Sequence, residues 1–250
     1  MKRHANRFLI EVDNLSLSYR IAHNQAKSLR ETLINFAKRE SILTHHTALD
    51  GVSFSLSEGE TLAVLGRNGA GKSTLLKCLA RVLPPTKGRV VTRGVVAPLI
   101  ELGAGFHPDL TGRENAILYG TILGRSSRVM QTRIDDIAAW SGLGKFIDLP
   151  IRTYSSGMLG RLSFAVATDE APDILMVDEV LSVGDAEFQG RSKARMETIM
   201  RESACMVLVT HNLALVRELA TRAILIDNGK ITASGNPDNV VKKYESSLES

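Results

Sequence analysis

Hydrophobic and polar residues alternate in two segments near the start of the chain. Residues 8 to 19 read FLIEVDNLSLSY, in which Leu15, Leu17 and Tyr19 alternate with serines. Residues 52 to 56, VSFSL, follow the same period. Because successive side chains of a strand point to opposite faces, a period of two is typical of half-buried strands. We therefore expect these segments to form an antiparallel β edge subdomain.

Three later segments are hydrophobic without alternation. They are TLAVLG at 61–66, ILMVD at 174–178 and CMVLVTH at 205–211. Short continuous runs of this kind are typical of strands buried on both faces, as in a parallel sheet covered by helices. Each run is followed by a helix-like segment, so the pattern predicts an α/β fold with a mainly parallel core sheet.

A β-hairpin and a helical lobe are predicted on either side of the later strands. The segment AILIDNGKITASG at 223–235 has an Asn-Gly pair between two strand-like runs, which favours a hairpin that turns at Asn228 and Gly229. Residues from about 104 to 168 lack strand-like runs, and Thr111 and Glu114 form a capping box before helical spacing begins. We expect a helical lobe inserted between strands of the core, within a single domain over 1–250.

A further amphipathic helix is predicted between the first two strands, over residues 26 to 40. Leu29, Leu33 and Phe36 recur at helical spacing. Ser28 and Glu31 have the spacing of a capping box. The polar sides of this helix are basic, with Lys27, Arg30, Lys38 and Arg39.

Composition narrows the functional classes. The chain has 250 residues, 44% of them hydrophobic and 23% charged, which is ordinary for a globular domain with a sizeable core. A formal charge of +4 is too mild to indicate nucleic-acid binding without clustering, so no nucleic-acid partner is expected. Cys78 and Cys205 form no C-x-x-C pair, which argues against zinc or disulfides and fits a reducing compartment.

The sequence predicts neither a signal peptide nor a membrane span. The apolar run after the basic N-terminus is broken by Glu11 and Asp13. No stretch approaches the roughly 18 apolar residues that a membrane helix requires. Any role at a membrane must therefore depend on a partner.

Residues 66 to 73, GRNGAGKS, match the phosphate-loop pattern GxxxxGK[ST] directly after a predicted buried strand and before a predicted helix. The glycines let backbone N–H groups surround phosphates, and the helix N-terminus adds a positive dipole end. Lys72 would neutralise the β- and γ-phosphates, and the Ser73 hydroxyl would ligate Mg²⁺. The predicted ATP-binding residues of this loop are Gly66, Arg67, Asn68, Gly69, Ala70, Gly71, Lys72, Ser73 and Thr74.

Two adjacent carboxylates, Asp178 and Glu179, stand at the end of the run ILMVDE. An aspartate at a strand's carboxyl end beside a phosphate loop can hold Mg²⁺ through water. The adjacent Glu179 can act as a general base on the attacking water. Such a pair alone is more often a solvated strand end, and the phosphate loop makes the catalytic interpretation the better one.

In three further motifs the chain resembles the ATP-binding-cassette (ABC) ATPases. The segment Tyr154 to Met158, YSSGM, with Arg161 beyond it, is similar to the LSGGQ signature of that family. His211 in VTHN is similar to its switch histidine, and Asp185 in SVGD to its D-loop. The resemblance covers most of residues 8 to 240 and implies a P-loop NTPase fold of the ABC type.

The resemblance also implies that each active site is shared. In the family the signature loop, here Ser155, Ser156, Gly157 and Met158, caps the γ-phosphate of ATP bound to the opposite subunit, so we expect a head-to-tail homodimer across two ATP molecules. His211 would bond the γ-phosphate, and Tyr19 would stack on adenine. The alternatives are a strand-end histidine bonded to a neighbouring carbonyl and an aromatic residue packed at a rim.

Two positions depart from the family pattern. Ser156 stands where the signature usually has glycine, so N–H donation there requires a conformation that a non-glycine residue tolerates. Glu101 takes the place of the glutamine expected between the core and the helical lobe. Its carboxylate could ligate Mg²⁺ or orient water, and the alternative is an ordinary surface glutamate.

Finer features resemble the exporters of bacterial surface polysaccharides, such as O-antigen, capsule and teichoic acid. They are IELGAGFHPDLTGREN around Glu101, the YSSGM signature, VLSVGDAEF after Glu179, and the basic helix at 26–40. The resemblance implies an integral membrane permease as partner, a lipid-linked glycan as transported substrate, and a place on the cytoplasmic face of the bacterial inner membrane. Helix 26–40 would contact the permease, lipid phosphate or glycan; alternatively it packs on its own domain.

Other functions stay open within the same superfamily. The chain could energise an unrelated ABC transporter, or it could be a soluble ABC ATPase without a transport role. Soluble types need a tandem cassette, a long coiled coil or zinc cysteines, and we find none in this sequence. Some O-antigen exporter ATPases carry a carbohydrate-binding domain after the cassette, and we expect this chain to belong to the subgroup without it or to be a fragment.

Overall fold

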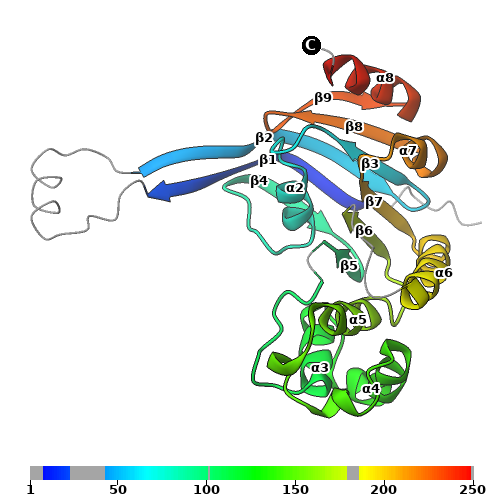
Figure 1. Ribbon diagram of the computed structural model, residues 1–250. Helices are drawn as coiled ribbons and strands as arrows, with labels where there is room; N and C mark the ends of the chain where they lie inside the picture. The colour runs from blue at the N-terminus through cyan, green and yellow to red at the C-terminus, as the bar shows by residue number, and fades with distance from the viewer. Residues whose placement is uncertain (1–7, 23–42, 101, 179–185, 249–250) are drawn as a thin grey trace, which may run out of the picture.

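A computed structural model describes residues 8–22, 43–100, 102–178 and 186–248. Two β-sheets lie against each other, and a lobe of helices extends from one side of the larger sheet (Figure 1). The predicted helix at 26–40 lies outside the described residues.

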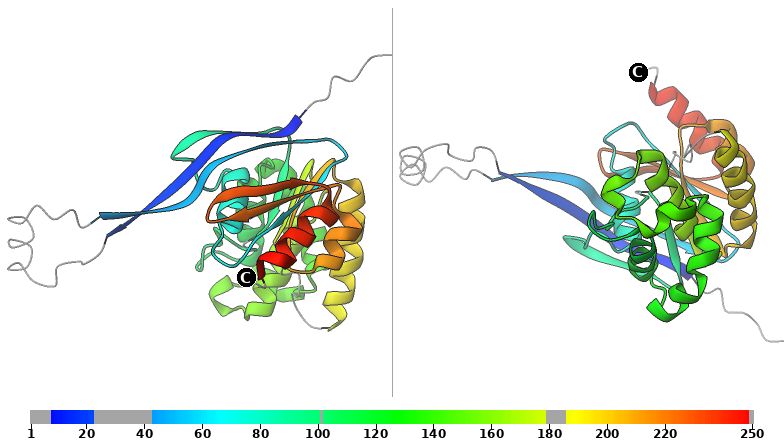
Figure 2. Two further views of the ribbon diagram at one scale, coloured as in Figure 1. Left: turned by 90° about the horizontal axis from the view of Figure 1, so that it is seen from above. Right: turned by 60° about the horizontal axis from the view of Figure 1, so that its bottom comes forward.

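The smaller sheet has three antiparallel strands in the order β2-β1-β4. They are β1 (Phe8–Ala22), β2 (Leu43–Ser57) and β4 (Lys87–Thr92). The predicted antiparallel edge sheet is confirmed, although β1 and β2 are longer than the alternating segments. Their far ends run on together as a two-stranded ribbon that projects from the body of the molecule (Figures 1 and 2).

The larger sheet has six strands in the order β5-β6-β7-β3-β8-β9, all parallel except the last. The predicted hairpin is confirmed between β8 and β9, with Asn228 and Gly229 both at positive φ (47° and 76°). The strands are β3 (Thr61–Leu65), β5 (Val96–Leu99), β6 (Ile174–Asp178), β7 (Cys205–Val209), β8 (Arg222–Asp227) and β9 (Lys230–Gly235).

Both faces of this sheet are buried, which explains the unbroken hydrophobic runs. In β3, Leu62 and Val64 face a core shared with the three-stranded sheet and helix α2 (Lys72–Leu79). The alternate residues Ala63 and Leu65 pack against α7 (Leu213–Leu219) and α8 (Pro237–Leu248).

The helical lobe is built from α3 (Gly112–Ile122), α4 (Ser127–Ser141) and α5 (Ser156–Ala167), with short 3₁₀ turns at Gly144–Asp148 and Ile151–Thr153. The predicted capping box starts α3: the Glu114 N–H donates to Thr111 Oγ1 at 3.1 Å, and the Thr111 N–H donates to the Glu114 carboxylate at 2.9 Å.

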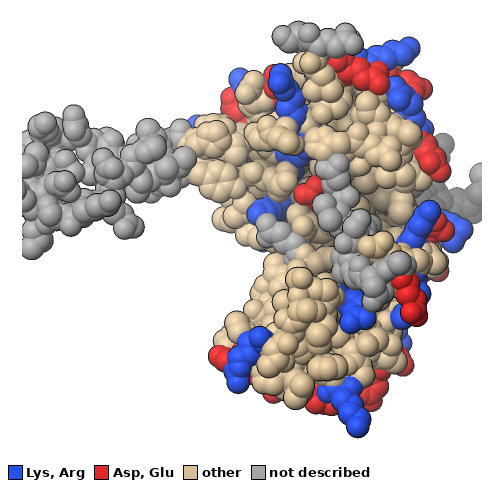
Figure 3. All heavy atoms as spheres, viewed as in Figure 1, with Lys and Arg blue, Asp and Glu red and all other residues tan. Residues whose placement is uncertain are grey.

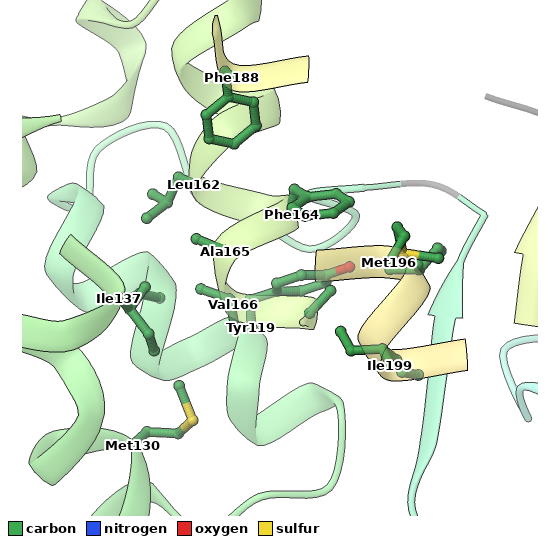
Figure 4. Packing of buried hydrophobic residues seen from close by; sticks show 14 of the residues in the cluster. Tyr119, Met130, Ile137, Leu162, Phe164, Ala165, Val166, Phe188, Met196 and Ile199 are labelled. Atoms are coloured by element: carbon green, nitrogen blue, oxygen red, sulfur yellow. The ribbon is translucent and has the colours of Figure 1, made fainter. Parts of the chain in front are cut away.

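A hydrophobic cluster joins the lobe to the core. Phe164 of α5 is fully buried, and α6 (Ala186–Glu202) adds Phe188 and Met196 to the same cluster (Figure 4). Trp140 of α4 stacks on Phe164, with ring centroids 5.5 Å apart and planes at 20°. Because α5 and α6 share this core, the two helices are fixed to one another.

The distribution of surface charge and the burial of the two cysteines are typical of a globular protein. On the face in Figure 3, basic and acidic side chains are interspersed over both core and lobe. Within the described ranges, no helix has the length and apolar character that a bilayer crossing needs. Cys78 and Cys205 are buried free thiols, and burial raises their pKa to about 11 and about 12 respectively.

Candidate nucleotide-binding site

The carboxyl ends of three adjacent parallel strands bring the predicted site residues together. In the sheet, β7 lies between β6 and β3, with Val209 opposite both Asp178 and Val64. The phosphate loop follows β3, and His211 follows β7. The carboxyl edge of a parallel sheet is where such folds bind ligands, because the strand ends leave a crevice there.

Two glycines of the loop are required by close contacts. Gly66 has φ 154°, and a Cβ there would lie 2.3 Å from the carbonyl oxygen of Ile226. Gly71 has φ 110°, and a Cβ there would lie 2.5 Å from the carbonyl oxygen of Ala48. The loop is therefore pressed against the end of β8 and the interior of β2, and only glycine permits both this approach and these torsions.

Lys72 is held inside the loop. It begins helix α2, and its side chain is largely buried, at 8% exposure. Its ammonium donates to the carbonyl oxygens of Gly66 at 2.6 Å and Arg67 at 3.0 Å. A positive charge is thus fixed where the backbone N–H groups of a helix N-terminus also converge, which is an arrangement that attracts phosphate.

Ser73 and Asp178 provide a pair of oxygen ligands that suit Mg²⁺. The Ser73 hydroxyl donates to Asp178 Oδ2 at 3.3 Å. Neighbouring ligands of an octahedral magnesium ion with bonds of about 2.1 Å lie about 3 Å apart. The two side chains therefore fit adjacent positions around one ion, the remainder being supplied by water and phosphate oxygens.

Several predicted residues meet in one cavity of about 350 Å³. Its lining includes residues of the phosphate loop together with Asp178 and His211. Tyr19, 38% exposed, lines it too, although β1 continues three residues beyond Tyr19 to Ala22 instead of ending there as expected. The full lining is Tyr19, His46, Ala48, Asn68, Gly69, Gly71, Lys72, Ser73, Thr74, Asp178, Val209 and His211.

Some predicted residues stand elsewhere. Arg67 lines a separate cavity of about 330 Å³, beside the β8–β9 hairpin and α8. Gly66 and Ala70 shape the loop from behind and are buried. Glu101, Glu179 and Asp185 lie outside the described residues.

Sequence reasoning missed His46. This exposed residue of β2 lies directly opposite Tyr19 in the β1–β2 ladder and lines the cavity with it. The alternation of β1 could have placed Tyr19 on the cavity side, but the partner across the ladder depends on the strand register, which a single sequence does not reveal.

The signature segment forms the exposed N-terminus of α5. The side chain of Ser155 caps this helix by accepting a bond from the Met158 N–H at 3.2 Å. Ser156 is helical, so serine in place of glycine needs no unusual torsion. No signature residue lines the described part of the cavity of its own chain.

Tyr154, just before this helix, is anchored to the lobe. Its hydroxyl donates to the carbonyl oxygen of Phe146 at 2.5 Å, and burial raises the pKa of the phenol. A Cβ at Gly112 would lie 2.2 Å from that hydroxyl, so glycine at the start of α3 makes room for it. The residue before the signature helix is thereby bonded to the 3₁₀ turn Gly144–Asp148 and lies against the start of α3.

A parallel sheet with a phosphate loop at its carboxyl edge and an inserted helical lobe defines a P-loop NTPase. The ABC transporter family model matches residues 49–182. The chain therefore belongs to the ABC transporter family and is an ATPase of the ATP-binding-cassette type.

Curated relatives include O-antigen export system ATP-binding proteins. The chain is 46% identical to one from Myxococcus xanthus, over 81% of this chain and 46% of that protein. It is 38% identical to one from Klebsiella pneumoniae, over 96% of this chain and 98% of that protein. A teichoic acids export ATP-binding protein of Lactococcus lactis is 39% identical over 79% of this chain and 42% of its own length. The chain thus spans under half of the Myxococcus and Lactococcus proteins and nearly all of the Klebsiella protein.

Solved structures show the same fold. An ATP-binding subunit of an ABC transporter superposes with a TM-score of 0.68 at 21% identity, over 97% of this chain and all of that one. A dimeric ATP-binding cassette in a post-hydrolysis state, bound to ADP and Pi, gives a TM-score of 0.63 at 19% identity, over 91% and 98% of the two chains.

Proposed function

We propose that this chain hydrolyses Mg-ATP in sites shared between two copies, and that hydrolysis powers export of a lipid-linked surface polysaccharide through a membrane permease. The observation that carries the ATPase part is the single cavity that unites the phosphate loop, Asp178 and His211. Similarity along nearly the whole length of an O-antigen export ATP-binding protein supports the substrate class.

We assign binding of the triphosphate to the phosphate loop. Its backbone N–H groups surround the phosphates, and the Lys72 ammonium exchanges its bonds to Gly66 and Arg67 for bonds to β- and γ-phosphate oxygens. Ser73 and Asp178 would hold Mg²⁺, with Glu101 as a further ligand or water-orienting group. Magnesium supplies positive charge that offsets the charge of the triphosphate.

We assign activation of the attacking water to Glu179, the next residue after Asp178. A carboxylate at this position can take a proton from water as the water attacks the γ-phosphorus and the bond from that phosphorus to the bridging oxygen of ADP breaks. His211, at the end of the neighbouring strand, would donate a hydrogen bond to the γ-phosphate. Its place in the cavity supports this role; the alternative is a strand-end histidine bonded to a neighbouring carbonyl.

We propose that a second copy of the chain completes each site. Ser155, Ser156, Gly157 and Met158 form an exposed helix N-terminus, where N–H groups can receive the γ-phosphate of a facing copy. Asp185 would contact the same interface. A head-to-tail homodimer places each signature segment opposite the other chain's phosphate loop.

Transport is assigned to an integral permease, with this subunit at the cytoplasmic face of the bacterial inner membrane. The segment 26–40, which lies between β1 and β2 in the sequence, is proposed to contact the permease or the lipid-linked glycan. A teichoic acid, a capsular polysaccharide or an unrelated substrate of another ABC transporter is the alternative, as is a soluble ABC ATPase.

Deletion of the gene in its bacterial host is expected to remove the surface polysaccharide and leave lipid-linked glycan inside the cell. A plasmid copy of the wild-type gene should restore export, and a copy that encodes Glu179→Gln should not. The measurement is electrophoresis of surface glycan, combined with affinity purification of the subunit from detergent-treated membranes. Unchanged surface glycan after deletion, with no co-purified permease, would contradict the transport proposal.

A further inference from the structure

We propose that His46 is a second nucleobase-binding residue, which forms with Tyr19 a two-ring platform at the outer end of the cavity. This inference rests on the proposed binding of ATP to the phosphate loop. It assigns a role to a residue that no motif of the chain identifies.

The two rings stand on the same side of the ribbon. Tyr19 of β1 and His46 of β2 are direct partners in the antiparallel ladder. Side chains of directly opposed residues share one face, with Cβ atoms roughly 4.5–5.5 Å apart. Both side chains are exposed and both line the cavity. The rings therefore lie side by side on the wall of the cavity, where one flat ligand can cover both.

The register that pairs them is fixed by the neighbouring pair of residues. Ser18 and Thr47 are also direct partners, and their hydroxyl oxygens lie 3.1 Å apart in a hydrogen bond. The Ser18 N–H donates in addition to Thr86 Oγ1 at 3.1 Å. Since adjacent side chains alternate, these bonds lie away from the cavity and keep the face with Tyr19 and His46 turned toward it.

The platform is at the right distance from the phosphates. Ala48, on the same strand, is in contact with the phosphate loop at Gly71. His46 lies two residues earlier on the same strand, about 7 Å away along it, and lines the same cavity as Ala48. A triphosphate bound at Lys72 would extend its ribose and base in that direction, because Tyr19, His46 and the loop line one cavity.

Ring stacking is the chemistry that such a platform offers. Every nucleobase has a π face, and stacking on an aromatic side chain contributes to affinity without reading the base edge. The imidazole of His46 doubles the number of rings beneath the base. We therefore expect the platform to strengthen binding of nucleotides and to have no effect on a polyphosphate that lacks a base.

Calorimetric titration of the full-length chain tests this directly. His46→Ala is expected to weaken ATP affinity about 3- to 10-fold, and His46→Phe to retain it within about 2-fold, because only the latter keeps a ring. Inorganic tripolyphosphate should bind wild type and His46→Ala equally. His107→Ala, which removes an exposed histidine that does not line the cavity, is the matched control and should bind ATP like wild type. In His46→Trp, ATP should quench the added tryptophan fluorescence, and tripolyphosphate should not.

Three results would overturn the inference. They are unchanged ATP affinity in His46→Ala, an equal loss of affinity for tripolyphosphate, and His46→Phe behaving like alanine. Failure of the proposed function is distinguishable from these: wild type would then bind neither ATP nor tripolyphosphate. If wild type binds ATP and His46→Ala binds it equally well, only the second ring is disproved.

Discussion

Glu179→Gln is expected to lower the turnover number for ATP by about 10²–10⁴-fold, the range that a positioned general base contributes. The amide cannot take the proton of the attacking water, whereas Lys72, Ser73 and Asp178 still hold the nucleotide. ATP should therefore bind and persist, and the variant should accumulate as an ATP-bound dimer. Steady-state phosphate release measures the first effect, and light scattering with and without ATP measures the second.

Glu187→Gln is the matched control for this prediction. Glu187 is an exposed residue in the first turn of α6, eight positions further along, and it undergoes the same chemical change. It should hydrolyse ATP at the wild-type rate. A Glu179→Gln variant that does the same would show that another group accepts the proton.

Lys72→Ala is expected to weaken ATP affinity by about 10- to 100-fold. A hydrogen bond to a charged group contributes about 1.5–3 kcal/mol, and each 1.4 kcal/mol corresponds to a factor of ten. The buried ammonium now bonds Gly66 and Arg67, and its loss would leave the phosphates to the backbone N–H groups, Mg²⁺ and His211. Titration calorimetry measures the change.

Lys87→Ala provides the comparison for the lysine prediction. Lys87 is an exposed lysine of β4 outside the cavity, and its replacement by alanine removes the same charge away from the site. Its ATP affinity should equal that of wild type. Equal affinity in Lys72→Ala would instead show that the phosphates bind elsewhere.

The core sheet was predictable because a strand that is buried on both faces needs hydrophobic residues at every position, which gives a continuous hydrophobic run in the sequence. Residues 61–65, 174–178 and 205–209 are strands within a residue or two of the predicted bounds, since each hydrophobic run ends where its strand leaves the core. The phosphate loop was predictable for a related reason: the chemistry of phosphate binding needs glycine, lysine and serine at fixed spacing, and that spacing is local.

Features set by non-local contacts were not predictable. His46 faces Tyr19 only because of the register between β1 and β2, and the sequence carries no mark of that register. Arg67 belongs to the loop motif yet lines another cavity, because the hairpin and α8 pack beside it. The concern over Ser156 disappears because the residue is already within a helix, a boundary that sequence places only approximately.

The side chain of Asn115 is a further determinant that the hydrophobic pattern did not reveal, although its partners are close in the sequence. It is fully buried, and its amide donates to the carbonyl oxygens of His107, Leu110 and Thr111 at 2.9–3.1 Å. These bonds hold the loop that leads into the lobe. In the sequence, Asn115 is merely one polar residue within a predicted helix.

The central claim, that two copies complete each active site, is tested most directly by mixing two inactive variants. Lys72→Ala disables the phosphate loop, and Gly157→Asp places a carboxylate at the signature helix N-terminus, where the structure has space for a side chain. In a mixed dimer, one site combines the intact loop of the second variant with the intact signature of the first. At an ATP concentration too low to fill the Lys72→Ala loop, the account predicts that ATP hydrolysis, absent from each variant alone, returns on mixing. No recovery at any ratio, or full activity of Gly157→Asp alone, would contradict it.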